Sequence, residues 1–308
     1  MTRTSWILLF SLGSIWGGTF FCTEILLLTM TPSHIVSFRV SLGALAMLVF
    51  IHLRGQRLPT NWQNWRWFLM MGFFNNAFPF TCIVFGQQYI TGGLASILNS
   101  FTAFIAVVTG AIFLSDERIT WPRTIGTMLG VAGVAVTMGL DHLMQLSLTS
   151  IGQFLVLLST ISYAIASVLG RMQMGRTSVE VSATGMLICS SGWMLVFSLM
   201  VEGVPVMAMD TTSILAILAY AIPFTSVAYL LYFNLLRRAG AANTMLVTII
   251  VPVSALLLDA FALGEVISMR EMISSGIFPI SLMFFNGQVP LEVLKPLLPK
   301  SKISQITA

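Results

Sequence analysis

The residues of this chain that could do chemistry are polar side chains placed singly or in pairs inside long apolar segments. No phosphate-binding glycine loop ending in Lys-Ser/Thr and no HExxH motif occurs. Three cysteines fall singly in apolar runs, a spacing that favours neither a disulfide framework nor a metal site: Cys22, Cys82 and Cys189. The sequence therefore predicts that the chain is not an enzyme and holds no cofactor or metal. It also argues against pumping driven by ATP on this chain alone.

Carboxylates are rare inside the apolar segments. Glu24 and Arg39 lie at similar depth in neighbouring segments, so an ion pair between them would lower the cost of burying both charges. Asp259 is about one helical turn from the end of its segment. It could be a proton-coupling carboxylate or an acid that reaches water at the membrane interface.

Hydroxyl and amide side chains form a stripe at helical spacing in one segment and a shorter one in another. Ser96, Asn99 and Ser100 would share a helix face, and Thr244 and Thr248 are one turn apart. These faces could line a cavity. They could equally be packing faces, because small and hydroxyl residues let membrane helices approach and hydrogen-bond.

An amide pair stands out in the third apolar segment. Because two adjacent amides are costly in lipid, at least one of Asn75 and Asn76 should face the protein interior. Pro79 would kink the helix or free a backbone carbonyl for a partner.

Aromatic residues complete the candidate set. Trp16 lies deep in the first segment beside two glycines, followed by Thr19, and could form a cavity floor, a gate or a packing contact. Tyr163 occupies a comparable position in the sixth segment, and Tyr229 lies in the eighth. The candidate substrate-binding residues are Trp16, Thr19, Asn75, Ser96, Asn99, Tyr163, Tyr229, Thr244 and Thr248.

The segments that position these residues are membrane spans. Only 8% of the residues are charged and 56% are hydrophobic, whereas soluble domains carry about 25% charged residues. Because a span needs about 20 apolar residues, nine segments qualify: 5–29, 34–53, 66–88, 92–114, 122–140, 150–171, 180–201, 211–236 and 241–263. A tenth, at about 270–286, is short, contains Pro279 and is atypical. We expect an all-α integral membrane protein with ten transmembrane helices.

Basic residues in the connections set the orientation. With ten spans and a cytoplasmic N-terminus, every Lys and Arg except Arg39 and Arg270 falls on the cytoplasmic side. The basic residues are not clustered on one surface, so the net charge of +4 does not indicate a nucleic-acid partner.

A weak internal repeat divides the chain. Residues 91–126 and 239–274 share the same order of small residues, a long apolar run, a glutamate and a polar break, and Glu117 aligns with Glu265. Each half holds five spans, an odd number, so the second half must be inverted. The expected divisions are 1–140, a linker at 141–149, an inverted repeat at 150–286 and a cytoplasmic tail at 287–308.

Several motifs in this arrangement resemble the drug/metabolite transporter superfamily, and most closely its EamA-type permeases. They are WGGTF from Trp16, SFRVSLGAL around Arg39, LSDERITWPRTIGTMLGVAGV around Glu117 and ALGEVISMREMI around Glu265. The similarity covers about residues 5–275, and assigns structural roles to Glu24, Arg39, Glu117 and Glu265. The chain departs from the family at Glu24 and in the tenth span, which lacks the usual glycines. An irregular last helix would put activity in doubt.

The resemblance implies a central cavity and transport without ATP. We therefore expect a multi-pass protein of the bacterial inner membrane, a secondary transporter that exports amino acids or related small metabolites by alternating access. A non-transporting scaffold or sensor subunit is the alternative. The expected partners are a small-molecule substrate and the lipid bilayer, with the chain a monomer or a homodimer.

Overall fold

The computed structural model describes residues 2–113, 148–173, 177–205, 210–232 and 247–285, and the positions 125, 126, 128–130, 132, 133, 136, 234, 235 and 238. Within these residues all regular secondary structure is helical. The helices are α1 (Arg3–Leu27), α2 (Pro32–Leu53), α3 (Trp62–Gly72), η1 (Phe73–Ala77), α4 (Phe78–Gly86), α5 (Gly92–Asn99), α6 (Thr102–Phe113), α9 (Leu148–Gln173), α10 (Val179–Val201), α11 (Thr211–Ala221), η2 (Ile222–Val227), α13 (Val247–Leu258), η3 (Asp259–Leu263) and α14 (Met269–Phe285).

Seven of the described helical segments are long and apolar enough to cross a membrane: Arg3–Leu27, Pro32–Leu53, Trp62–Gly86, Gly92–Gly110, Leu148–Gly170, Val179–Val201 and Thr211–Tyr232. A shorter apolar helix covers Ile250–Leu263. The all-α membrane fold is therefore confirmed. The segment at about 270–286 forms helix α14, whereas most of the span expected at 122–140 lies outside the described residues.

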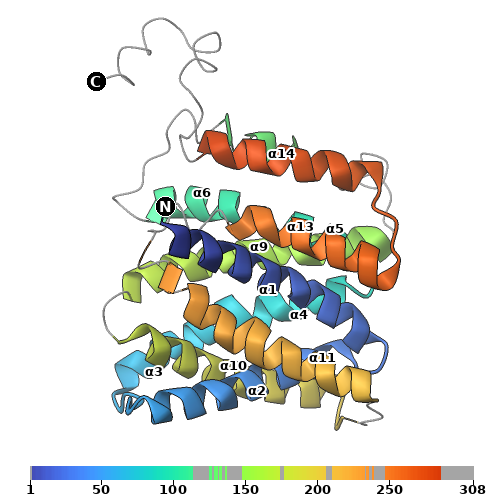
Figure 1. Cartoon of the computed structure of the whole chain (residues 1–308). Coiled ribbons are helices and arrows are strands. Elements are labelled where there is room, and N and C mark those ends of the chain that lie inside the picture. The colour runs from blue at the N-terminus through green and yellow to red at the C-terminus, as the bar shows by residue number, and fades with distance from the viewer. Residues whose placement is uncertain are drawn as a thin grey trace, which may run out of the picture.

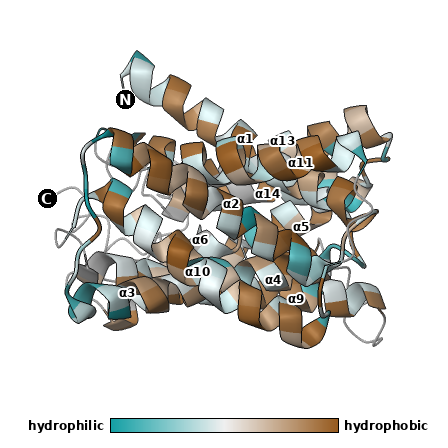
Figure 2. Cartoon of the chain, turned by 90° about the horizontal axis from the view of Figure 1, so that it is seen from below, coloured by the Kyte–Doolittle hydropathy of each residue, from teal (hydrophilic) through white to brown (hydrophobic). Residues whose placement is uncertain are grey.

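The helices run roughly side by side, as Figure 1 shows, with α14 on one side of the bundle and α2 with α10 on the opposite side. Helix α1 packs along α13, and α9 packs against both α4 and α6. In Figure 2 most polar residues collect toward the two ends of the helices, while their middle parts are mostly apolar. This distribution is the one a bilayer requires of spanning helices.

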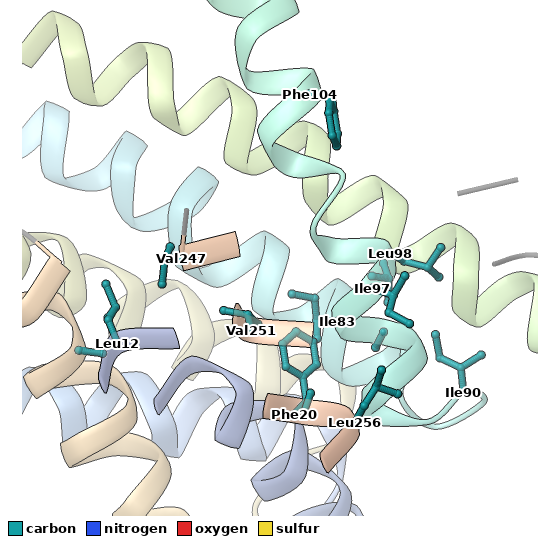
Figure 3. Packing of buried hydrophobic residues seen from close by; sticks show 14 of the residues in the cluster. Leu12, Phe20, Ile83, Ile90, Ile97, Leu98, Phe104, Val247, Val251 and Leu256 are labelled. Carbon is teal, nitrogen blue, oxygen red and sulfur yellow. The ribbon is translucent and has the colours of Figure 1, made fainter. Parts of the chain in front are cut away.

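The main hydrophobic cluster joins the first helix to helices far away in the sequence. Leu12 and Phe20 of α1 pack in one cluster with Val251 and Leu256 of α13 (Figure 3). Gly17 makes this contact possible, because a Cβ there would lie 2.4 Å from the Cβ of Ser254. The Trp-Gly-Gly motif therefore serves close helix packing.

Three π-helical segments occur among the described residues, and two of them, η1 and η2, lie at prolines. The π-helix η1 precedes Pro79, and η2 contains Pro223. The Phe74 carbonyl in η1 accepts a hydrogen bond of 2.7 Å from the Ser162 hydroxyl of α9. The expectation that Pro79 leaves a carbonyl for a partner is consistent with this bond. Single π-turns of this kind occur often at functional sites.

A break of another kind separates α5 from α6. Ser100 and Phe101 form a turn between the two helices, visible in Figure 3 between Leu98 and Phe104. The interruption places Asn99 at the end of a helix, whereas the sequence predicted one continuous segment over 92–114.

Candidate functional site

A hydrogen-bonded amide network lies where η1 faces the eighth span. The Tyr229 hydroxyl donates to Oδ1 of Asn76 at 2.6 Å and accepts from Nδ2 of Asn75 at 3.1 Å. Nδ2 of Asn76 donates to the Ser190 hydroxyl of α10 at 2.9 Å. Asn76 is fully buried, which confirms that one member of the asparagine pair faces the interior. The network joins three spans through side chains alone.

Arg39 is buried beside this region and is held by uncharged groups. Its Nε donates to the Thr225 hydroxyl and its Nη1 to the Tyr220 hydroxyl, both at 2.9 Å. Its guanidinium carbon lies 3.6 Å from the ring centroid of Phe80 and 4.2 Å from that of Tyr220. A guanidinium between two aromatic faces is stabilised by cation–π attraction, which is stronger away from water.

Aromatic side chains from distant spans meet on both sides of this region. Trp16 packs on Tyr232 with ring centroids 5.6 Å apart. Tyr163 contacts both major hydrophobic clusters and lies 6.5 Å from the Phe80 ring. Trp16, Asn75, Tyr163 and Tyr229 are thus inward-facing residues of the described spans.

The predicted ion pair between Glu24 and Arg39 does not form, so this prediction is wrong. Glu24 instead accepts a hydrogen bond from the Gly92 amide at the start of α5. Asp259 accepts one from the neighbouring Gly93 amide at 2.5 Å. The reason is the packing of α1 and α13 around α5, which brings two carboxylates to a helix N-terminus whose partial positive charge attracts them.

The hydroxyl residues of the predicted stripe bind their own helices. Ser96 donates to the Gly93 carbonyl at 2.7 Å, and Ser100 donates to the Ser96 carbonyl at 3.0 Å. Thr19 likewise donates to the Trp16 carbonyl at 2.6 Å. Asn99 differs, because its buried Oδ1 has no hydrogen-bond partner among the described residues. Only Asn99 of this set has a buried polar atom left for another molecule.

Some candidates cannot be placed. Thr244 and Glu117 lie outside the described residues, and so does the side chain of Thr248. Glu265 lies in the connection between η3 and α14, where partial burial and the nearby Glu271 carboxylate raise its pKa.

A cavity of about 330 Å³ opens at the end of the bundle where α5 begins, and the polar groups in its lining are mainly acids and hydroxyls. Asp259, Glu265 and Glu271 contribute three carboxyl groups. This cavity is separate from the amide network, so the structure holds two polar regions.

Sequence reasoning missed several residues of these regions. Ser190, Tyr220 and Thr225 bind the amide pair and Arg39 from spans far along the chain. The hydroxyl groups carry no local signal, since serine and threonine are common in membrane helices. The buried arginine was itself a signal that polar partners must lie nearby.

Together these features define a polytopic helical membrane protein with polar groups enclosed between broken spans. A family model described as the EamA-like transporter family matches residues 4–139 and again 150–287. The chain belongs to this family. The helical fold also matches a solved crystal structure with a TM-score of 0.68 and 16% identity, covering 92% of this chain and 96% of that one.

Relatives from distant organisms are similar along nearly their whole length. The uncharacterized transporter YoaV of Bacillus subtilis is 21% identical, over 89% of this chain and 96% of its own. An uncharacterized transporter of Archaeoglobus fulgidus is 24% identical over 88% and 95%. The uncharacterized inner membrane transporter YedA of Escherichia coli K12 is 24% identical over 94% and 93%.

The family and the spans together define the class of protein. The chain is a multi-pass transporter of the inner membrane and not an enzyme. A transporter of this kind acts on small molecules within the lipid bilayer.

Proposed function

We propose that this chain is a secondary transporter that exports amino acids or related small metabolites by alternating access. The observation that carries the proposal is the network of Asn75, Asn76 and Tyr229, which joins two π-helical spans through side chains inside the membrane. Interrupted helices are a recurring element of substrate sites in secondary transporters.

The geometry of Asn75 suits exchange with a substrate. Its Nδ2 contacts three acceptors at 3.1, 3.4 and 3.5 Å, on Tyr229, Asn76 and Met186. The contact to Asn76 is weak because N–H···O hydrogen bonds lose strength beyond about 3.2 Å, and the contact to Met186 is weak because a thioether sulfur is a poor acceptor. A substrate oxygen could replace them at little cost, whereas both polar atoms of the Asn76 amide have a closer partner, which fixes its position.

The groups around Asn75 favour a substrate with both polar and apolar parts. Tyr163 and the Trp16–Tyr232 pair supply aromatic surface, and Asn75 and Tyr229 supply neutral hydrogen-bonding groups. Arg39 adds one buried positive charge, with no carboxylate paired to it among the described residues. Thr19, Ser96, Asn99, Thr244 and Thr248 remain candidate contacts of this site, and Glu117 keeps its proposed structural role.

We also propose that the ten spans form two inverted halves, 1–140 and 150–286. The helix contacts support this arrangement because they occur in matching pairs. Helix α1 of the first half packs on α13 of the second, and their counterparts in the opposite halves, α9 and α6, also pack on each other. In the same way α3 packs on α10, and their counterparts α11 and α2 pack on each other. The π-helices η1 and η2 begin 149 residues apart, at positions 73 and 222, close to the repeat spacing of 148.

The inverted arrangement can be tested with single cysteines, after replacing the three buried native ones. We expect a cysteine at Glu265 to react with an impermeant maleimide added outside intact cells. One at Arg54 should react only after the cytoplasmic side is exposed. Labelling of both positions from the same side would overturn the proposed topology.

Transport itself is tested by counterflow in proteoliposomes against labelled amino acids, nucleosides and organic cations. The proposal predicts saturable accumulation of one or more amino acids, and uptake of the same substrate into inverted membrane vesicles. Folded protein that moves none of these classes would contradict it and favour a non-transporting role. Saturable uptake of nucleosides or cations alone would contradict the substrate class.

A further inference from the structure

Three carboxylates from separate parts of the chain meet beside the start of α5. Glu24 comes from α1, Asp259 from η3 and Glu265 from the connection to α14. One oxygen from each lies within 4.8 Å of the others. The substrate proposal uses none of these groups, so the cluster needs its own account.

Two buried carboxylate oxygens of the cluster have no hydrogen-bond partner among the described residues. The Gly92 and Gly93 amides each take one oxygen, from Glu24 and Asp259 respectively. The two oxygens without a partner in the described part of the chain are Glu24 Oε2 and Asp259 Oδ1. Asp259 is only 2% exposed and lines the cavity of about 330 Å³. A buried, unpartnered carboxylate oxygen beside a cavity indicates a missing positive charge or donor.

The surrounding charges increase this need. Glu271 lines the same cavity, and none of the residues in its lining is a lysine or arginine. Arg270 is adjacent in sequence but is not part of the lining and has an interaction of its own. A helix N-terminus supplies only about half a positive charge, which is too little to balance three carboxylates. Like charges this close cannot all remain ionised without a cation.

We propose that Glu24, Asp259 and Glu265 form a calcium-type divalent cation site. The oxygens are hard ligands, which favour Ca²⁺ or Mg²⁺ over zinc or copper. The three oxygens lie within 4.8 Å of one another, close enough to share one ion. Calcium accepts oxygen ligands in flexible geometry, whereas magnesium demands a near-ideal octahedron, so three carboxylates from separate elements favour calcium.

The proposed ion would bind three structural elements to one another. It would connect the last turn of α1, the first residue of η3 and the connection to α14, beside the start of α5. This site stands apart from the amide network and does not depend on which substrate is carried.

Terbium luminescence tests the site directly in purified, detergent-solubilised protein. Tb³⁺ replaces Ca²⁺ at oxygen sites, and Tyr89 lines the same cavity and can transfer excitation energy to it. We expect a saturable signal that Ca²⁺ displaces at lower concentration than Mg²⁺. Asp259→Asn should weaken Tb³⁺ binding about tenfold or more.

Two further variants separate loss of a ligand from loss of the fold. Glu265 is the most accessible of the three, so Glu265→Gln should fold normally and still weaken binding. Glu180→Gln, a carboxylate at the start of α10 outside the cluster, should bind Tb³⁺ like the parent. Absence of a saturable signal, or equal binding by the parent and by Glu265→Gln, would overturn the proposal. A stabilisation by acid alone, with no effect of Tb³⁺ or Ca²⁺, would also overturn it and assign the cluster to shared protons.

Discussion

Arg39 and the carboxylate cluster are two buried charged regions that the same bundle treats differently. Arg39 is enclosed by two aromatic faces and two hydroxyls, all of them uncharged. Glu24 and Asp259 each have one oxygen bound to a backbone amide and a second, buried oxygen with no partner in the described part of the chain. The first environment suits a permanent charge. The second is incomplete without a cation or proton, and changes at the two regions should therefore have opposite effects.

The largest effect is expected from removing the arginine. Arg39→Ala should destabilise the protein by about 3 kcal/mol, because the aromatic contacts are lost and a cavity remains. Thermal unfolding in detergent, followed by circular dichroism, measures the change. Arg54→Ala is the matched control, since Arg54 is exposed and stacks more distantly on Phe50, at 5.2 Å. Equal effects at the two arginines would show that the enclosure of Arg39 contributes nothing special.

Neutralising the carboxylate should act in the opposite direction. In the presence of a chelator, Asp259→Asn should stabilise the protein by about 1 kcal/mol, because one of several neighbouring like charges disappears. The remaining carbonyl oxygen can still accept from the Gly93 amide. The same unfolding measurement applies, with Glu180→Gln as the control. Destabilisation by Asp259→Asn under these conditions would remove the contrast with Arg39.

The pH dependence of stability should reveal the repulsion between the carboxylates of the cluster and the neighbouring Glu271. The pKa of Glu265 is raised from its ordinary value of 4.5, so its ionised form costs stability at high pH. In chelator, stability should therefore increase as the pH falls through the raised pKa toward 4.5. Glu265→Gln should make this profile shallower, and an unchanged profile would exclude Glu265 as a source of it.

The smallest effect on stability is expected in the amide network. Tyr229→Phe should cost about 0.6 kcal/mol, the average for a side-chain hydrogen bond between membrane helices. Asn76 keeps its bond to Ser190 in this variant. Thermal unfolding of this variant should be measured alongside Arg39→Ala for comparison. A loss of unfolding free energy as large as that of Arg39→Ala would mean that Tyr229 is essential to the stability of the fold.

Sequence reasoning recovered the helices because hydropathy and length determine a span almost by themselves. Segments such as 34–53 and 180–201 match α2 and α10 within about two residues. The break at Ser100 and Phe101 was missed, since neither residue is a helix breaker and the turn depends on packing.

The candidate site was only partly accessible from sequence. The asparagine pair and Pro79 carried local signals, because amides and proline are costly inside a span. The pairing of Glu24 with Arg39 was wrong because depth along a helix does not tell which face a side chain occupies. Gly92 and Gly93 could not be foreseen as carboxylate partners, since backbone amides at a helix start leave no mark in composition.

The most direct test of the account is the rate of amino-acid counterflow by Asn75→Ala in proteoliposomes. The control is Asn234→Ala, an amide toward the end of the span that carries Tyr229, outside the network. We expect Asn75→Ala to lower the initial rate about tenfold, which is ~1.4 kcal/mol of lost stabilisation. Its thermal unfolding should stay close to that of the parent, and Asn234→Ala should transport normally. A parental rate in the Asn75→Ala protein would contradict the claim that the amide network binds the substrate.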